Sequence, residues 1–157
     1  MFSFDHDESR PTRQRGPYVL LFRLSLVMYL LSFFLPAYAE TTNGKMDSFA
    51  GYDAFAAAFG LPFSPALSLP IASAAMFGSA WLANPCFWLA AACFYDRRYL
   101  LASILGAGGP ILSLPIWIVF RTGDQSSLLA GFYLWVSSMV TLASAASIMW
   151  RKTEGPA

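Results

Sequence analysis

The sequence has few charged residues, and this shortage excludes most soluble proteins. Lys, Arg, Asp and Glu make up 12% of its 157 residues, whereas soluble domains carry about 25% charged residues. A surface with so little charge is expected to face lipid rather than water. The ten basic and nine acidic residues leave no basic field large enough to hold nucleic acid. We therefore predict a membrane protein that contacts the lipid bilayer and has no nucleic-acid partner.

Metal ligands and catalytic groups are also scarce. The only histidine, His6, lies in the polar N-terminal segment, and the two cysteines, Cys86 and Cys93, form no CxxC pair. Zinc sites and covalently attached haem need closer sets of ligands, so we expect no metal and no cofactor. The hydrophobic runs after residue 70 contain no ionisable Asp, Glu, His, Lys or Arg in their apolar interiors. This argues against ion-coupled transport and catalysis, so we predict a non-enzymatic protein without catalytic residues.

Four hydrophobic runs are long enough to cross the ~30 Å hydrocarbon core of a bilayer as helices. They predict an all-α fold, a polytopic membrane protein whose four transmembrane helices form one bundle over residues 18–150. The helices are expected at about 18–38, 73–95, 99–120 and 127–150. A disordered tail, 1–17, precedes the bundle, and a short tail, 151–157, follows it.

The first run has a competing interpretation as a cleaved secretory signal. Basic residues extend to Arg23, an apolar core runs from Leu24 to Leu35, and Ala37-Tyr38-Ala39 has the small-residue pattern of a cleavage site. The apolar segment that begins at residue 18 is longer than most signal cores, which favours a retained helix. Within that helix, Arg23 is expected to extend its long side chain to the membrane interface.

One long loop, residues 39–70, joins the first two spans and is net acidic. Within it, the segment 48–59 places Phe49, Tyr52, Phe55 and Phe59 at helical spacing. This stripe predicts a short interfacial helix, which lies on the membrane surface with its rings at the depth of the lipid headgroups. A lid that closes over a ligand is the alternative interpretation of the same segment.

The basic residues are sorted by position, and this sorting predicts the orientation of the bundle. Eight of them lie on the side of the two termini, and two lie on the other side. Both termini are therefore expected in the cytoplasm, with loops 39–70 and 121–126 on the outer side. The eight are Arg10, Arg13, Arg15, Arg23, Arg97, Arg98, Arg151 and Lys152, and the two are Lys45 and Arg121.

Helix-breaking residues lie near the middles of the second and third spans. The second contains Asn84-Pro85, and the third contains Gly106-Ala107-Gly108-Gly109-Pro110, followed by Pro115. Such residues commonly allow membrane helices to pack closely against one another. In transporters, helices broken at such residues also form binding sites. We favour packing as the interpretation. The Asn84 amide is expected to hydrogen-bond a neighbouring helix at Ser103, Tyr133 or Ser137.

The fourth span carries three hydroxyl side chains at helical spacing, Ser137, Thr141 and Ser144, among many small residues. Small and hydroxylated faces let membrane helices approach one another closely. The pattern leaves open whether the partner helix belongs to the same bundle, to another membrane subunit or to a second copy of the chain.

Four short stretches resemble a loose group of small bacterial four-helix inner-membrane proteins. They are LSFFLPAY (31–38), GYDAF (51–55), AWLANPCFWLA (80–90) and GFYLWVSSM (131–139). The resemblance touches all four predicted spans, and it implies a retained first helix and a bacterial inner membrane. It implies no activity, but it draws attention to Tyr52, Asp53, Asn84, Tyr133 and Trp135.

These observations predict an accessory or structural subunit that packs against other membrane proteins. The first alternative is a small-molecule or lipid-binding protein, with a pocket formed by the interrupted second and third spans beneath the 48–59 helix. A membrane immunity protein that protects against a membrane-targeted toxin is the second alternative. The candidate ligand-binding residues are Asn84, Pro85, Gly108, Gly109, Tyr52, Asp53, Tyr133 and Trp135.

Overall fold

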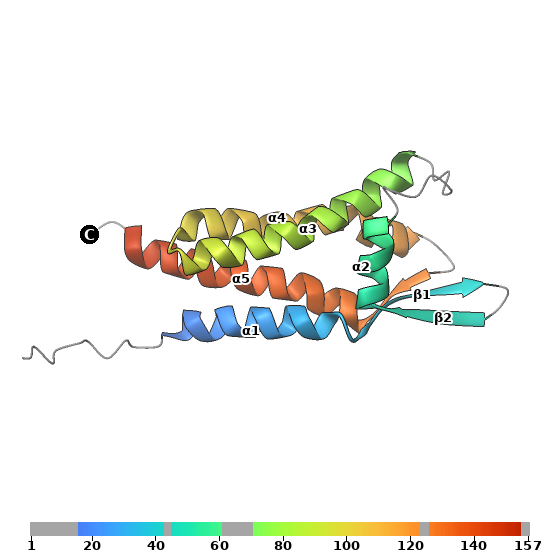
Figure 1. Ribbon diagram of the computed structural model, residues 1–157, viewed down its shortest axis with the longest axis horizontal. Helices are drawn as coiled ribbons and strands as arrows, with labels where there is room; N and C mark the ends of the chain where they lie inside the picture. The colour runs from blue at the N-terminus through green and yellow to red at the C-terminus, as the bar shows by residue number, and fades with distance from the viewer. Residues whose placement is uncertain (1–15, 43–44, 61–70, 123–125, 155–157) are drawn as a thin grey trace, which may run out of the picture.

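Four long helices, one short helix and a small sheet make up the described part of the computed structural model (Figure 1). The structure describes residues 16–42, 45–60, 71–122 and 126–154. The helices are α1 (Pro17–Ser32), α2 (Gly51–Gly60), α3 (Ile71–Tyr95), α4 (Tyr99–Thr122) and α5 (Ala130–Glu154). The strands are β1 (Pro36–Thr42), β2 (Lys45–Ala50) and β3 (Ser126–Leu128).

The long helices run along the long axis of the molecule, with the sheet and α2 at one end (Figure 1). Helix α1 packs against α5, and α4 packs against both α3 and α5. Helices α1 and α3 meet through aromatic rings. Phe22 stacks on Phe94 with ring centroids 4.5 Å apart, and Tyr29 stacks on Phe87 at 4.1 Å. The start of α1 and the end of α5 lie together at the end opposite the sheet (Figure 1).

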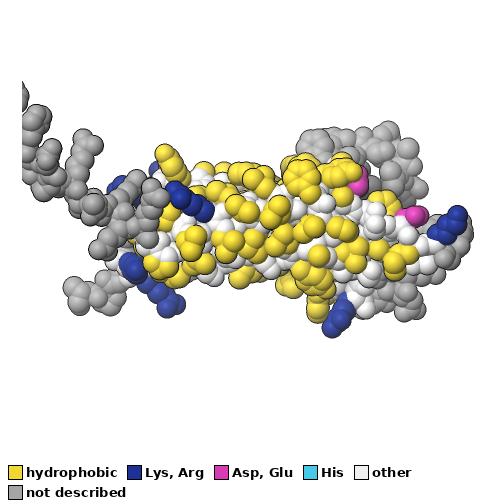
Figure 2. Space-filling view, turned by 90° about the horizontal axis from the view of Figure 1, so that it is seen from below, with side chains coloured by type: hydrophobic (Ala, Val, Ile, Leu, Met, Phe, Trp, Pro, Cys, Tyr) yellow, Lys and Arg dark blue, Asp and Glu magenta, His cyan; other side chains and the backbone are white. Residues whose placement is uncertain are grey.

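Small residues fill much of the contact between the helices. Ala83, Ala90 and Ala102 are fully buried, and a Cβ atom on Gly106 would lie 3.1 Å from the Cβ of Ala143. Many large apolar side chains lie instead on the outer surface, where Figure 2 shows them along the middle of the molecule. Two of the described helices, over Tyr99–Arg121 and Ala130–Thr153, are long and apolar enough to cross a membrane.

The first helix is shorter than the sequence predicts. The expected span reaches residue 38, but α1 ends at Ser32. Pro36 lacks a backbone N–H and disfavours helical geometry at Leu35, so the chain leaves the helix before it. It continues as β1, which pairs antiparallel with β2 in a hairpin and with β3, where Tyr38 lies opposite Leu128. The all-α prediction holds for most of the chain but misses this sheet.

The other three predicted spans coincide with α3, α4 and α5 to within a few residues. Both α3 and α4 continue through their prolines, at Pro85, Pro110 and Pro115. The prediction that these helices are interrupted is therefore wrong, because a helix tolerates proline where another group satisfies the carbonyl that loses its partner. Helix α5 extends to Glu154, so part of the predicted C-terminal tail is helical. The predicted disordered tail, up to residue 15, lies outside the described residues.

Helix α2 lies where the segment 48–59 predicts a helix, although residues 48–50 belong to β2. Its start is capped, because the N–H of Ala50 donates to Oδ2 of Asp53 at 3.2 Å. Two backbone bonds tie this start to the end of α1. They run from Gly51 N–H to the Leu35 carbonyl and from Tyr52 N–H to the Phe33 carbonyl, each 3.0 Å long. The position of α2 at a membrane surface stays a prediction.

Candidate functional site

The side chain of Asn84 lies where three helices meet, and it is 9% exposed. The hydroxyl of Tyr29 on α1 donates to Oδ1 of Asn84 at 2.8 Å, and Nε1 of Trp135 on α5 donates to the same oxygen at 3.0 Å. One carbonyl oxygen thus accepts two bonds, which use both of its lone pairs. This junction confirms that Asn84 bonds neighbouring helices, but the predicted partners Ser103, Tyr133 and Ser137 are wrong.

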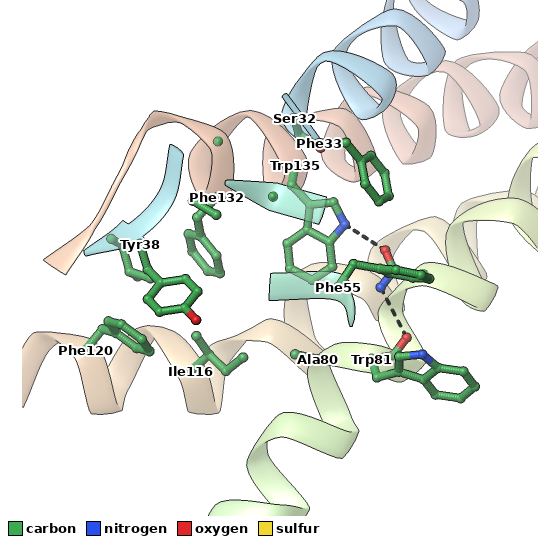
Figure 3. Close-up of a pocket in the computed structure, with 15 residues that line it drawn as sticks. Ser32, Phe33, Tyr38, Phe55, Ala80, Trp81, Ile116, Phe120, Phe132 and Trp135 are labelled. Carbon is green, nitrogen blue, oxygen red and sulfur yellow. Dashed lines mark hydrogen bonds between the residues drawn. The ribbon is translucent and has the colours of Figure 1, made fainter. Parts of the chain in front are cut away.

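The amide nitrogen of Asn84 repairs the helix at the proline that follows. Pro85 has no N–H, so the carbonyl of Trp81 loses the donor that an unbroken helix would supply. Nδ2 of Asn84 donates to that carbonyl across 3.4 Å, as the dashed lines in Figure 3 show together with the bond from Trp135. The amide has two N–H donors, and its bonds within the described part of the chain use one of them. The second has no partner within the described residues.

A cavity of about 110 Å³ lies beside Asn84, at the end of the bundle that carries the sheet. Seven of its fifteen lining residues are aromatic, including Phe33, Phe120 and Phe132 (Figure 3). Seven elements contribute to the lining, and β2 is the described strand that does not. The lining residues are Ser32, Phe33, Ala37, Tyr38, Gly51, Phe55, Ala80, Trp81, Asn84, Ile116, Phe120, Leu128, Gly131, Phe132 and Trp135.

The segments over the cavity are held by ring contacts and by close backbone approach. The ring of Phe55 on α2 meets Phe33 edge-on at 5.6 Å, and Tyr38 on β1 meets Phe120 at the same distance. Gly131 lets α5 approach the start of β1, since a Cβ there would lie 2.7 Å from the Leu35 carbonyl oxygen and 2.8 Å from that of Pro36. A side chain at residue 131 would therefore push the cover away from the bundle.

Two of the eight predicted ligand-binding residues, Asn84 and Trp135, line this cavity, and Pro85 follows directly in α3. The other five lie elsewhere. Tyr52 and Tyr133 are more than half exposed, and Asp53 caps α2. A Cβ on Gly109 would strike the Met139 side chain, so Gly109 is a packing glycine. A Cβ on Gly108 would meet nothing within 4 Å, and neither glycine lines the cavity.

Sequence reasoning missed most of the aromatic lining, and it also missed Tyr29, which donates to Asn84 beside the cavity. A tyrosine in the middle of an apolar run is a usable signal, because its hydroxyl needs a partner once it is buried. Tyr29 is 1% exposed. The phenylalanines carry no such signal, since an apolar ring in a membrane span is equally consistent with contact with lipid.

The chemistry of the lining suits binding. Its residues carry no carboxylate, histidine, lysine or arginine, and its polar side-chain groups are an amide, two hydroxyls and two indoles. Such a surface holds a mostly apolar molecule and orients it through one or two hydrogen bonds. No known protein family, curated protein or solved structure matches this chain.

Proposed function

We propose that the chain is a non-enzymatic protein of a bacterial inner membrane that binds a small apolar ligand in the cavity beside Asn84. In this proposal α1, α3, α4 and α5 span the membrane, and both termini are cytoplasmic. The observation that carries the proposal is a cavity with an aromatic wall, built from seven elements, beside a buried amide with a donor to spare. If the helices served only to pack against one another and against other subunits, side chains would be expected to fill this cavity.

Exposed apolar side chains on all four long helices support four spans. Leu24 on α1, Leu89 on α3, Ile104 on α4 and Val140 on α5 are each more than two-fifths exposed. Water would make such a surface costly, whereas lipid accommodates it. Helix α1 rises only ~24 Å over its 16 residues, but the apolar segment 33–35 continues in the same direction (Figure 1).

The distribution of charge supports the orientation. Arg97 and Arg98 lie in the turn between α3 and α4, and Arg151 and Lys152 lie in the last turns of α5, all at the end where α1 begins. In Figure 2 dark blue side chains flank the apolar surface at its two ends, and acidic side chains lie near the sheet. The more basic end of a membrane protein is usually cytoplasmic.

Labelling of single cysteines tests the orientation. In a Cys86→Ala, Cys93→Ala background, Ser48→Cys in β2 is expected to react with a membrane-impermeant maleimide in intact cells. Thr153→Cys at the end of α5 is expected to react only after the membrane is permeabilised. Both positions are exposed, so accessibility to water alone does not distinguish them. Equal labelling of the two in intact cells would contradict four spans.

The size and polarity of the cavity define the class of ligand. An engineered apolar cavity of ~150 Å³ binds benzene, so a cavity of about 110 Å³ holds a single ring or a short piece of alkyl chain. The free N–H of Asn84 calls for an acceptor, such as a carbonyl or ether oxygen. Acetophenone, one ring with one carbonyl, is a suitable probe, and ethylbenzene has a similar shape without the acceptor.

Filling the cavity tests the binding. For the purified protein in detergent, acetophenone at ten times its Kd is expected to raise Tm by about 3–6 °C, and ethylbenzene by less. Ala80→Leu places a larger side chain in the cavity and is expected to abolish this rise. Ala92→Leu makes the same change on the outer surface of α3 and is expected to leave it intact. An equal rise in the wild type and Ala80→Leu would show that acetophenone acts on the micelle, and would overturn the binding site.

An accessory role in packing against other membrane subunits is the second candidate. The observation in its favour is that Ser137 and Ser144 lie on the outer surface of α5. The hydroxyls of Thr141 and Ser144 bond to carbonyls of their own helix, each at 2.8 Å. These two hydroxyls are thus satisfied, and a second helix can approach them without leaving either donor unpaired.

A further inference from the structure

An open groove of about 630 Å³ lies on the outer surface between α4 and α5 and shares no lining residue with the cavity beside Asn84. Small residues form its floor, because α4 and α5 nearly touch where Gly106 faces Ala143. Ile111 and Ile148, both more than a third exposed, stand along its sides. Arg151 lies at the end nearest the basic turn. The groove is therefore apolar along its length and positively charged at one end.

The hydroxyls in the groove offer no free donors. Ser103 on α4 and Ser147 on α5 share a hydrogen bond of 2.7 Å, and Ser147 also donates to the Ala143 carbonyl at 2.8 Å. Ser144 donates to the Val140 carbonyl. A hydrocarbon chain can thus lie against these serines without leaving a donor unsatisfied.

The length and charge of the groove match one half of a lipid bilayer. From Arg151 to Val140 the rise along α5 is ~16 Å, about half of the ~30 Å hydrocarbon core. Arg151 is exposed and borders the groove. Its neighbour Lys152 points elsewhere and lies over the ring of Tyr18 on α1, 5.4 Å from the ring centroid.

We propose that this groove binds one anionic phospholipid of the cytoplasmic leaflet, with an acyl chain between α4 and α5 and its phosphate at Arg151. The proposal rests on the membrane orientation given above, which places Arg151 at the cytoplasmic surface. It does not depend on the cavity beside Asn84. The planar guanidinium of arginine binds phosphate oxygens through two parallel hydrogen bonds. The ammonium of lysine acts as a point charge and lacks this geometry.

Native mass spectrometry tests this site. The protein is released from micelles that contain equal amounts of phosphatidylglycerol and phosphatidylcholine with the same acyl chains. We expect bound phosphatidylglycerol to exceed phosphatidylcholine about fivefold, the ratio that ~1 kcal/mol for one basic residue produces. Arg151→Gln is expected to bring this ratio close to one. Lys152→Gln removes the same charge one residue away and is expected to preserve the preference.

A second variant tests the apolar part of the groove. Ala107→Phe fills the groove from α4 at an exposed position that lines it, and is expected to reduce the binding of both lipids. An equal loss of preference in Arg151→Gln and Lys152→Gln would indicate diffuse attraction and overturn the site. Unchanged lipid binding in Ala107→Phe would also overturn the site. A dimer of the protein that carries no bound lipid would overturn it as well. If cysteine labelling confirms the orientation while Arg151→Gln has no effect, the lipid site fails, whereas the proposed orientation stands and the cavity is unaffected.

Discussion

Replacing Asn84 by leucine is expected to lower the free energy of unfolding by about 2–4 kcal/mol, because it leaves two buried donors without an acceptor. The hydroxyl of Tyr29 and the indole N–H of Trp135 both donate to the Asn84 oxygen, and leucine offers them nothing. The Trp81 carbonyl also loses the amide that compensates for Pro85. Unfolding of the purified protein in mixed micelles with a graded denaturing detergent measures the change.

Tyr29→Phe serves as the matched control for this variant. It keeps the ring that stacks on Phe87 and removes one donor, so a loss of only about 1 kcal/mol is expected. In the double variant the Tyr29 donor is already absent, so the two losses are expected to be less than additive. Additive losses, or an Asn84→Leu protein as stable as the wild type, would contradict the junction.

Asn84→Leu also separates the two candidate functions. If the protein binds acetophenone through the free N–H of Asn84, the ligand-induced rise in Tm is expected to fall to the level seen with ethylbenzene. The comparison requires a folded variant, which a single cooperative unfolding transition establishes. An undiminished preference for acetophenone would show that the N–H of Asn84 does not hold the ligand, and would overturn this part of the proposal.

Replacing Gly131 by alanine is expected to cost about 1–3 kcal/mol, although alanine is the better helix former. The added Cβ would lie 2.7 and 2.8 Å from the backbone carbonyl oxygens of Leu35 and Pro36. Backbone cannot move aside as a flexible side chain does, so the start of α5 and the start of β1 must separate. Because both segments border the cavity, the variant is also expected to bind acetophenone more weakly.

Gly108→Ala is the control for this second variant. A Cβ at Gly108 in α4 would meet nothing within 4 Å, so the change is expected to raise stability by up to ~1 kcal/mol through helix propensity alone. Opposite signs for the two glycine variants in the same unfolding assay are the expected result. A gain in stability for Gly131→Ala would show that the cover of the cavity does not pack as described.

Some features of the site could be anticipated from local sequence, and others could not. Asn84 stands out because an amide in an apolar run needs partners, and Pro85 signals a carbonyl that needs a new donor. The identity of those partners could not be anticipated. Tyr29 and Trp135 lie 55 and 51 positions away, and many other hydroxyl and indole groups were equally eligible.

The glycines illustrate the same limit. In the third predicted span, Gly106, Gly108 and Gly109 are indistinguishable as helix-weakening residues. In the structure Gly106 and Gly109 face α5, at Ala143 and Met139, while Gly108 faces open space. Rotation by about 100° per residue separates these environments, but only the position of the neighbouring helix decides which glycine lies in contact.

The sequence by itself determined the long helices α3, α4 and α5 and the segregation of basic residues to one end. These properties depend on the length of each apolar run and on local hydrogen bonds, so neighbouring residues suffice to specify them. Only the tertiary structure decided how β1 lies between β2 and β3 and that a cavity remains beside Asn84. These features depend on contacts such as that between Tyr38 and Leu128, whose partners are distant in the chain and come together only when the helices pack.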